Sequence, residues 1–344
     1  MEKTLNAEPV DHLWIKDIEE GGRIRGRYVV REKRLSNTKK GDPFLTLTLA
    51  DRTGDVEAKV WDQVETLTAT FGVGDILGVE GKATSYRGRV QLTLTGIEVV
   101  DGDVDPSLFL ESSGKSSVAM MARLRKILQE MENTHLKGLM DRFLGDRRFV
   151  SLFEKAPAAK NFHHNYVGGL LEHTLSVCLM AVGVAEHYPQ LDRDLLLAGA
   201  FLHDIGKVRE LNAHLTIEYT DEGRLVGHLV QGTLMVEEKL ARMKHFPADL
   251  AVRLKHLILS HHGEYAFGSP KRPKFLEAFV LHLLDDLDAK VNGLGRLFEK
   301  DGHEGAWTEY SRLFDRFFLK GNMAPAEEGT VTNDAEEDQQ GTLF

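Results

Sequence analysis

The first third of the chain alternates hydrophobic and polar residues with period two, which is typical of β-strands with one buried face. Residues 44–49 show the pattern most clearly, as Phe-Leu-Thr-Leu-Thr-Leu. Further strands are expected at residues 22–31, 56–61, 76–84 and 90–100, and a short helix at residues 62–71. Turn-forming residues separate these elements at 36–43, 51–55 and 86–89. This order within residues 13–101 predicts a small five-stranded β-barrel, the OB-fold.

Helical spacing begins after residue 117. Residues 102–117 are mostly polar and are predicted to be a linker. Met121, Leu124 and Leu128 then repeat every three or four residues, as in an amphipathic helix. The pattern stays helical to about residue 319, so residues 118–319 are predicted to form an all-α domain, whereas residues 320–344 have too little apolar content to fold and are predicted to be a disordered acidic tail. The fold class is therefore multi-domain α+β, with an N-terminal five-stranded OB-fold β-barrel followed by an all-α domain.

Composition excludes several classes of protein. The single cysteine, Cys178, rules out an intramolecular disulfide and a thiolate zinc cluster. The N-terminus has no apolar core of the kind found in signal peptides, and no segment approaches the roughly 18 apolar residues needed to cross a bilayer. We therefore expect a cytoplasmic protein with no membrane partner.

Charge is distributed unevenly along the chain. The formal net charge of −10 argues weakly against a nucleic-acid partner, but the tail after Gly321 contributes six acidic residues and no Lys or Arg. Residues 21–40, in contrast, contain eight basic residues and one acid, Glu32. A local basic stripe matters more to a polyanion than net charge does, because salt screens interactions beyond about one Debye length.

Basic residues gather in the two predicted loops through which OB-fold barrels commonly bind single-stranded nucleic acid. These loops join strands 1–2 and 4–5. The candidate contacts are Lys33, Arg34, Lys39 and Lys40 in the first loop, Arg87 and Arg89 in the second, and the aromatic residues Phe44, Trp61 and Tyr86. Taken singly, Phe44 and Trp61 are more typical of a barrel core, yet the two basic loops together favour single-stranded RNA, or DNA, as a partner.

The helical region contains histidines and aspartates flanked by apolar residues. They are His173, the adjacent His203 and Asp204, His228, the adjacent His261 and His262, and Asp285. Histidine and carboxylate together are the ligand set of divalent metals. Their separation in sequence places each group on a different helix, which favours a dinuclear catalytic metal centre over a structural zinc finger.

Asp204 carries the strongest signal of this set. Residues 194–205 are hydrophobic almost all round the expected helix, and an ionised carboxylate there is very costly unless it is paired or bound to a metal. Gly206 would end that helix and place Lys207 beside the metals. A cation at a helix end is also favoured by the helix dipole alone, so Lys207 has a second, purely structural interpretation.

The complete ordered set resembles the signature of HD-domain metal-dependent phosphohydrolases, an all-α superfamily. More specifically, the chain resembles the YhaM-type 3′→5′ exoribonucleases, which join an N-terminal OB-fold to an HD domain. The matching segments are His163-His164-Asn165-Tyr166-Val167-Gly168-Gly169-Leu170-Leu171-Glu172-His173-Thr174, Gly227-His228, Ser260-His261-His262-Gly263, Gly268-Ser269-Pro270 and Leu284-Asp285-Asp286-Leu287-Asp288-Ala289-Lys290. The resemblance covers roughly residues 13–315. It implies a 3′→5′ exonuclease acting on single-stranded RNA, with DNA left open.

The resemblance also implies roles for individual residues. Asp204 would bridge two divalent ions, with Mn²⁺ expected and Fe, Co²⁺ and Mg²⁺ left open. Lys207 would stabilise the charge that develops on the phosphate or help the leaving oxygen depart. The other ligands would be His173, His203 and Asp285 at one ion, and His228, His261 and His262 at the other. The choice of Asp285 over Asp286 rests on the family match alone.

Two further assignments keep alternatives open. His164 would contact the scissile phosphate, or would hold a ligand ring from behind. Gly268, Ser269 and Pro270 would line the substrate entrance, or would form a plain turn. Cyclic-dinucleotide phosphodiesterases of the same superfamily have Gly-Tyr-Pro at this position, which counts against that substrate.

Rival functions remain at this stage. One is an HD-type nucleotide or cyclic-dinucleotide phosphohydrolase. Another is a non-catalytic nucleic-acid-binding or replication-associated protein, which would have no need for seven buried ligands. The C-terminal residues Gln340, Leu343 and Phe344 resemble a peptide that binds the bacterial sliding clamp, the alternative being an unstructured end. A homo-oligomer is compatible with the sequence.

Overall fold

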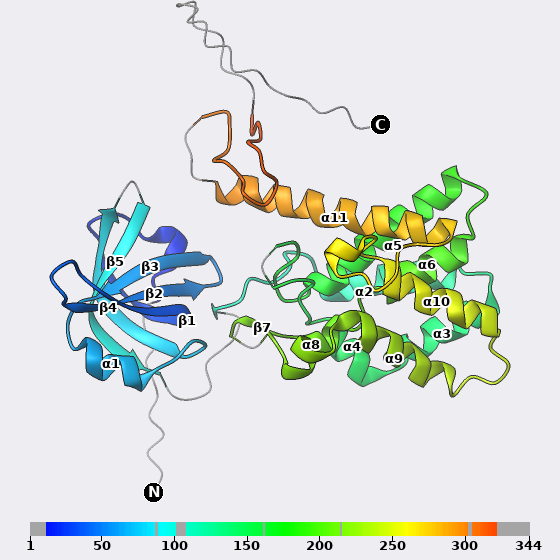
Figure 1. Cartoon of the computed structure of the whole chain (residues 1–344), viewed down its shortest axis with the longest axis horizontal. Helices are drawn as coiled ribbons and strands as arrows, with labels where there is room; N and C mark the ends of the chain where they lie inside the picture. The colour runs from blue at the N-terminus through cyan, green and yellow to red at the C-terminus, as the bar shows by residue number, and fades with distance from the viewer. Residues whose placement is uncertain are drawn as a thin grey trace, which may run out of the picture. The chain divides into compact units, whose positions relative to one another are not determined.

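The computed structural model describes residues 12–86, 89–100, 108–160, 162–213, 215–301 and 305–321. Contacts divide the chain into two units, Met1–Gly293 and Leu294–Phe344. The first unit contains a β-barrel and a mostly helical domain, whose elements are labelled in Figure 1. Gln340, Leu343 and Phe344 lie outside the described residues. A sliding-clamp partner therefore stays a prediction, as does self-association.

The barrel closes in the strand order β1-β2-β3-β5-β4, which confirms the predicted OB-fold. Alternation along β2 points Leu45, Leu47 and Leu49 into the core, where each is 0% exposed. The elements are β1 Arg23–Asn37, β2 Pro43–Asp51, β3 Gly54–Val60, α1 Val64–Thr70, β4 Ile76–Tyr86 and β5 Arg89–Val99.

Strand β1 runs well past its predicted end at residue 31. Its first half pairs with β4 and its second half with β2, and a bulge next to Val30 separates the two halves. Lys33 and Arg34 therefore lie on a strand, and the β1–β2 loop is confined to residues 38–42. The prediction placed both residues in the loop because the run of charges hides the alternation.

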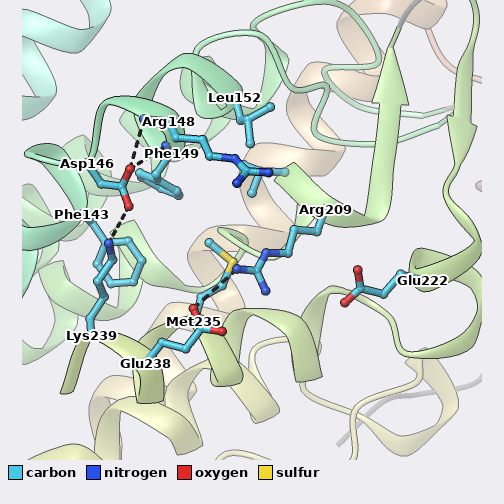
Figure 2. A pocket seen from close by; sticks show the side chains of 11 residues that line it. Phe143, Asp146, Arg148, Phe149, Leu152, Arg209, Glu222, Met235, Glu238 and Lys239 are labelled. Carbon is cyan, nitrogen blue, oxygen red and sulfur yellow. Dashed lines mark hydrogen bonds and ion pairs between the residues drawn. The ribbon is translucent and has the colours of Figure 1, made fainter. Parts of the chain in front are cut away.

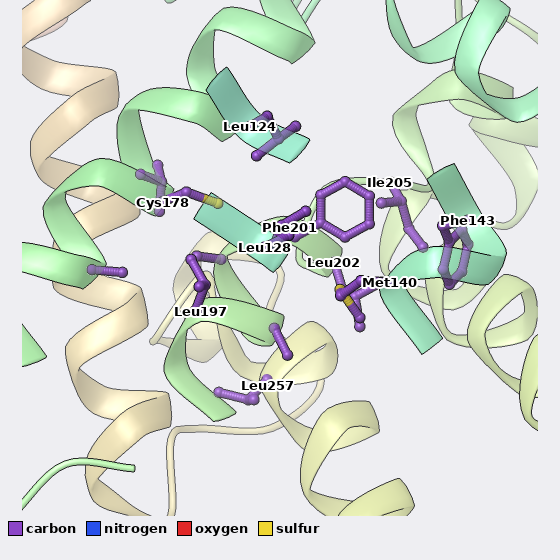
Figure 3. Packing of buried hydrophobic residues seen from close by; sticks show 14 of the residues in the cluster. Leu124, Leu128, Met140, Phe143, Cys178, Leu197, Phe201, Leu202, Ile205 and Leu257 are labelled. Atoms are coloured by element: carbon purple, nitrogen blue, oxygen red, sulfur yellow. The ribbon is translucent and has the colours of Figure 1, made fainter. Parts of the chain in front are cut away.

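The helical domain is built around the buried helix α6 (Arg193–Leu202). Residues 194–202 are all buried, as their hydrophobic pattern predicted, and α6 packs against α3, α5 and α10. Figure 3 shows Phe201 and Leu202 packed with Leu128 and Met140 of neighbouring helices. The other helices are α2 Ser117–Gln129, α3 Thr134–Leu144, α4 Arg147–Phe153, α5 Gly169–His187, α7 Lys207–Glu210, α8 Asp221–Leu225, α9 His228–Leu240, α10 Ala248–Ser260 and α11 Leu276–Lys300.

Two regions contradict the all-α prediction for residues 118–319. Strands β6 (Leu211–Ala213) and β7 (Ile217–Tyr219) form a small antiparallel sheet. Residues 305–321, which are the described part of the second unit beyond α11, contain isolated bridges and no helix. Strands of three residues and single bridges are too short to show alternation, so periodicity could not reveal them. The domain is mostly helical rather than all-α.

Helix α5 differs from the expectation that no segment is long and apolar enough to cross a membrane. An 18-residue window within Gly169–His187 has a hydropathy of 1.3, which meets that criterion by length and composition. More than half of this window is buried inside the protein, as in the core helix of a globular domain. The same helix carries His173 into the interior.

Candidate metal centre and nucleic-acid surface

The predicted metal ligands converge within the helical domain although they come from different helices. Their nitrogen and oxygen atoms form overlapping groups in which all atoms lie within 4.8 Å of one another. His173 lies on α5, His203 and Asp204 follow α6, His228 begins α9, His261 and His262 follow α10, and Asp285 lies on α11. Each of the seven belongs to at least one group.

One carboxylate oxygen of Asp204 faces the first group. Asp204 Oδ2 lies 3.4 Å from His203 Nε2 and 3.6 Å from His173 Nε2. Asp285 Oδ1 lies 3.2 Å from His173 Nε2 and 3.7 Å from His203 Nε2. The two imidazole nitrogens are themselves 3.1 Å apart. Two nitrogens and two carboxylate oxygens therefore enclose a common space.

The other oxygen of Asp204 faces a second group. Asp204 Oδ1 lies 3.5 Å from His261 Nε2 and 3.6 Å from His228 Nε2. His262 Nε2 lies 3.3 Å from His228 Nε2. Asp204 is thus placed between two sets of imidazoles, one at each carboxylate oxygen.

The hydrogen bond at Nδ1 of each histidine ligand fixes the orientation of its ring and directs Nε2 toward the centre. In all five histidines Nδ1 faces an oxygen, and an oxygen acceptor requires Nδ1 to carry the proton. The partners are Asp288 Oδ2 for His173 (2.7 Å), Ala200 O for His203 (2.9 Å), Glu210 Oε1 for His228 (2.9 Å), Ile258 O for His261 (2.8 Å) and Phe267 O for His262 (3.0 Å). In the neutral ring Nε2 then points its lone pair inward, as metal-ligating histidines do.

The electrostatics of the centre favour positive charge. Burial opposes ionisation of Asp204, but the Lys207 ammonium and His203 hold the pKa of its carboxyl well below the usual value. Burial also opposes the charge on Lys207, but Asp204 and Asp285 raise the pKa of its ammonium. Burial alone would lower the pKa of His173, yet its hydrogen bonds with Asp285 and Asp288 raise it to about 9. The same carboxylates would stabilise a divalent ion in place of that proton.

The second oxygen of Asp204 tests whether these residues fit a metal. Asp204 Oδ1 is buried and has no hydrogen-bond partner among the described residues. A buried carboxylate oxygen without a partner is costly, and a cation held by His228, His261 and His262 would remove that cost. Imidazole nitrogen and carboxylate oxygen together suit divalent transition-metal ions. The residues present therefore fit a divalent metal.

Gly206 allows α9 to approach Asp204. A Cβ at Gly206 would lie 2.1 Å from the His228 carbonyl oxygen and 2.7 Å from the Gly232 nitrogen. Helix α6 already ends at Leu202, so the prediction that Gly206 ends this helix is wrong. The position requires glycine because two backbones meet there.

The three acids of α11 have different roles. Asp285 faces the centre, whereas Asp286 lies on the outer side and forms an ion pair with Lys290 at 2.7 Å. Asp288 holds His173 Nδ1 from behind and also accepts a hydrogen bond from Ser176. Asp288 was not predicted, although its spacing of three from Asp285 places both on one helix face and could have indicated it.

Glu210 is a second carboxylate that the sequence did not single out. Its Oε1 accepts hydrogen bonds from the backbone nitrogen of His228 at 3.0 Å and faces the ring Nδ1 at 2.9 Å. Burial would raise the pKa of Glu210, but these bonds with His228 lower it. Nothing local in the sequence marks this residue, because its partner lies 18 positions away.

His164 lies behind the centre rather than facing it. Its Nδ1 contacts the Tyr166 hydroxyl at 2.8 Å and its Nε2 contacts Asp288 Oδ2 at 2.9 Å. Both ring nitrogens are therefore engaged, and His164 acts on His173 through Asp288. Of the two alternatives, the geometry favours the one in which His164 holds a ligand ring and not the scissile phosphate.

The segment Gly268-Ser269-Pro270 forms a tight turn. Gly268 has a φ of +82°, and the buried Ser269 hydroxyl donates to the Leu259 and Lys271 carbonyl oxygens. Of its three residues, Gly268 and Pro270 are exposed. The turn follows Phe267, whose carbonyl oxygen holds His262, so it lies next to the second group of imidazoles.

A separate pocket of about 410 Å³ lies between α4, α7 and α9 (Figure 2). Its charged rim is mostly paired, with Lys239 2.7 Å from Asp146 and Arg209 3.6 Å from Glu238. None of the predicted metal ligands lines it. The pocket and the centre share only their proximity to the short helix α7.

The outer face of the barrel carries an aromatic pair and a basic row. Phe44 and Trp61 stack with ring centroids 4.9 Å apart, and Trp61 is 49% exposed. Arg34 lies opposite Thr46 and Thr46 opposite Lys59, whose ammonium is 5.3 Å from the Phe44 ring centroid. Trp61 is therefore not a core residue, unlike the typical single aromatic of a barrel, and it is available for stacking.

An acidic row limits this surface on one side. Glu32 lies opposite Thr48, and Thr48 lies opposite Glu57. The aromatic and basic groups are thus concentrated at the end of the face next to the β1–β2 loop. Lys39 and Lys40 are exposed in that loop.

The structure does not place Lys33 among these exposed cations. Lys33 pairs with Leu47 across the two strands, so its side chain points to the inner side of the barrel. Its ammonium donates to the Thr68 and Phe71 carbonyl oxygens at the end of α1 and lies 4.1 Å from the Phe71 ring centroid. Lys33 therefore has a structural role at the end of a helix, and its contact with nucleic acid stays a prediction.

The predicted contacts of the second loop are only partly described. Tyr86 is 59% exposed at the end of β4. Arg87 and the side chain of Arg89 lie outside the described residues, so their contacts stay predictions.

Comparison with family models agrees with this architecture. Residues 170–290 match the model of the HD domain, and residues 22–100 match that of an OB-fold nucleic acid binding domain. Residues 117–189 also match a model described as a putative helicase. Fold and site together define an HD-domain protein with an N-terminal OB-fold domain.

Relatives define the family more closely. The 3′-5′ exoribonuclease YhaM of Bacillus velezensis is 38% identical over 309 residues, which cover 88% of this chain and 96% of that protein. The protein of the same name from Listeria monocytogenes serotype 4b is 36% identical, with 82% and 90% covered. The chain belongs to the YhaM 3′-5′ exoribonuclease family. A solved OB-fold domain of replication protein A from Methanococcus maripaludis covers 27% of this chain and 99% of that chain, at 17% identity and a TM-score of 0.23.

Replacing Asp288 with Asn tests the hydrogen bonds behind the centre. An amide can donate to His173 Nδ1, which favours the tautomer with its proton on Nε2. We expect the affinity for Mn²⁺, measured by titration calorimetry, to fall about 10- to 100-fold. Asp286→Asn on the same helix is the matched control and should bind Mn²⁺ like the wild type. Wild-type affinity in Asp288→Asn would show that this bond does not orient a ligand.

Proposed function

We propose that this protein is a metal-dependent 3′→5′ exoribonuclease that shortens single-stranded RNA in the cytoplasm, with single-stranded DNA as a second substrate to be compared. Its relatives carry the name 3′-5′ exoribonuclease YhaM. The observation that carries the proposal is the position of Asp204, whose two oxygens each face a separate group of imidazoles. A carboxylate shared by two ion sites is suited to two-metal phosphoryl transfer.

The ligand assignment follows the two groups. Asp204 would be shared by two divalent ions, with Mn²⁺ as the favoured metal. His173, His203 and Asp285 would hold the first ion, and His228, His261 and His262 would hold the second. The ions would supply positive charge that activates water and neutralises charge on the phosphate. Asp288 and Glu210 accept hydrogen bonds from His173 Nδ1 and His228 Nδ1, and these bonds keep the two rings oriented before substrate arrives.

Lys207 places a positively charged side chain beside the proposed ion sites. Lys207 as a whole is 8% exposed, and its ammonium lies 2.6 Å from Asp204 Oδ2. A cation held there by its carboxylate partner is positioned to stabilise negative charge that develops on the phosphate oxygens. Lys207 is therefore assigned to charge stabilisation rather than to the helix dipole alone.

Burial around the centre indicates where the substrate enters. His173 and His203 are 0% exposed, whereas the side chains of Asp285 and His228 are 16% and 12% exposed and His262 is half-buried. The strand therefore approaches over Asp285 and the second ion site, beside the turn that contains Gly268, Ser269 and Pro270. A centre that is closed behind His173 and His203 accepts the end of a strand more readily than its middle, which favours an exonuclease.

The barrel surface supplies binding to the rest of the strand. Arg34, Lys39 and Lys40 offer positive charge for phosphates, and Trp61 with Phe44 offers a stacking surface for a base. Both contacts are tolerant of sequence, as a processing exonuclease requires.

The activity is tested with 5′-labelled single-stranded RNA and DNA and Mn²⁺. We expect products that shorten from the 3′ end, and we expect Asp204→Ala to lose activity by several orders of magnitude because both ion sites share this residue. Asp286→Ala, an exposed acid on α11, should remain active. If the wild-type protein degrades neither strand but hydrolyses a nucleotide or cyclic dinucleotide, the proposed metal centre would stand. The proposal that the substrate is a polymer would then be contradicted.

Replacing Trp61 with Ala tests the barrel surface. Loss of one base-stacking contact should weaken single-stranded RNA binding about tenfold or more in fluorescence anisotropy, since such contacts contribute roughly 1–3 kcal/mol. Trp307→Ala removes a similarly exposed tryptophan (51%) outside the barrel and should bind RNA like the wild type. Equal RNA affinity of the Trp61→Ala and Trp307→Ala variants would show that RNA does not bind to this face of the barrel.

A further inference from the structure

His163 has two buried imidazole nitrogens that form no hydrogen bond with any described residue. Buried polar groups are nearly always paired, because an unpaired one loses its hydrogen bonds to water and gains nothing in return. The exception at His163 therefore needs a physical reason.

The position of His163 supplies that reason. Its ring centroid lies 5.4 Å from that of His173, and the charged groups that act on it are Lys207, His173, Asp285 and Asp204. Burial, with the positive charge of Lys207, lowers the pKa of His163 to about 3. The imidazole thus lies beside the ligands of the first ion site but forms no hydrogen bond with their carboxylates.

The backbone next to His163 is strained and firmly held. His164 has a φ of +45°, which is rare for a residue other than glycine. Its nitrogen donates to Asn292 Oδ1 at 2.9 Å, and its carbonyl oxygen accepts from the Ala158 nitrogen at 3.1 Å. A Cβ at Gly169 would lie 2.0 Å from that carbonyl oxygen, so glycine is needed for this approach. Strain that the surroundings maintain in this way is concentrated at functional positions.

We propose that His163 donates a hydrogen bond to a non-bridging oxygen of the scissile phosphate, and this catalytic role rests on the proposed function. An imidazole carries at least one N–H whether neutral or protonated, so the role does not depend on its charge. Lys207 donates one of its N–H groups to Asp204, whereas the His163 N–H has no acceptor among the described residues. A phosphate oxygen supplies that acceptor, and a donor fixed in advance stabilises the charge that develops there.

The decisive variants are His163→Ala and His163→Asn in the full chain. His187, an exposed histidine at the end of α5, provides the matched control His187→Ala. For single-stranded RNA we expect kcat to fall about 10²- to 10³-fold in His163→Ala and KM to rise by at most about tenfold. His163→Asn should recover part of the rate because its amide also donates. Bound Mn²⁺ per chain and the Tm should match the wild type in both variants.

Binding of inorganic phosphate to the Mn²⁺-loaded protein separates this inference from the proposed function. Calorimetry should show about tenfold weaker phosphate binding in His163→Ala and no change in His187→Ala. If the wild type cleaves no RNA, the proposed function fails, and the phosphate titration alone decides the role of His163.

Three results would overturn the role of His163. Loss of Mn²⁺ from His163→Ala would make it a metal ligand. A lower Tm with unchanged phosphate affinity would make it a structural residue. Wild-type kcat together with wild-type phosphate affinity would show that it does not contact the phosphate.

Discussion

The buried carboxylate of Asp204 is the constraint on which the rest of the helical domain depends. Asp204 is 1% exposed and follows a helix whose residues are buried on every side, so water cannot solvate it. An ionised group in this position is stable only if the protein, or an ion that the protein holds, supplies compensating charge. Lys207 supplies part of it at one oxygen. The imidazoles around both oxygens offer lone pairs that would hold a divalent ion, and that ion would supply the rest of the compensating charge.

The arrangement of the helices follows from this requirement. Helices α5, α9, α10 and α11 each bring at least one nitrogen or oxygen into the groups of ligands around this carboxylate, and Gly206 allows α9 to come close enough. Hydrogen bonds behind the rings then turn every lone pair inward. The hydrophobic core shown in Figure 3 holds α6 rigidly, and a rigid α6 fixes where the charge lies. The same packed helices therefore stabilise the domain and position the ligands.

Most of the fold and of the ligand set could be predicted from the sequence, because the ligands are polar residues within apolar stretches. Alternation in residues 44–49 predicted the barrel, and the apolar run before Asp204 marked that residue as costly to bury. Asp288, Glu210 and His163 gave no comparable signal, because their roles depend on residues distant in the chain. Asp288, for example, lies 115 positions from His173.

The orientation of two candidates could not be read from sequence position for a similar reason. Lys33 belongs to a basic run, yet a β-bulge and the strand register turn it to the inner side, where it contacts the end of α1. Both ring nitrogens of His164 are engaged behind the centre, which favours the second of the two roles that the sequence left open for it. Residue type and spacing identify candidates, whereas register and backbone direction decide what each side chain meets.

The most direct test of this account is to locate metal by anomalous scattering in crystals grown with Mn²⁺. We predict two peaks, one beside each oxygen of Asp204, the first near His173 and His203 and the second near His228 and His261. A single peak, or two peaks that do not have Asp204 between them, would contradict the central claim that this carboxylate joins two ion sites.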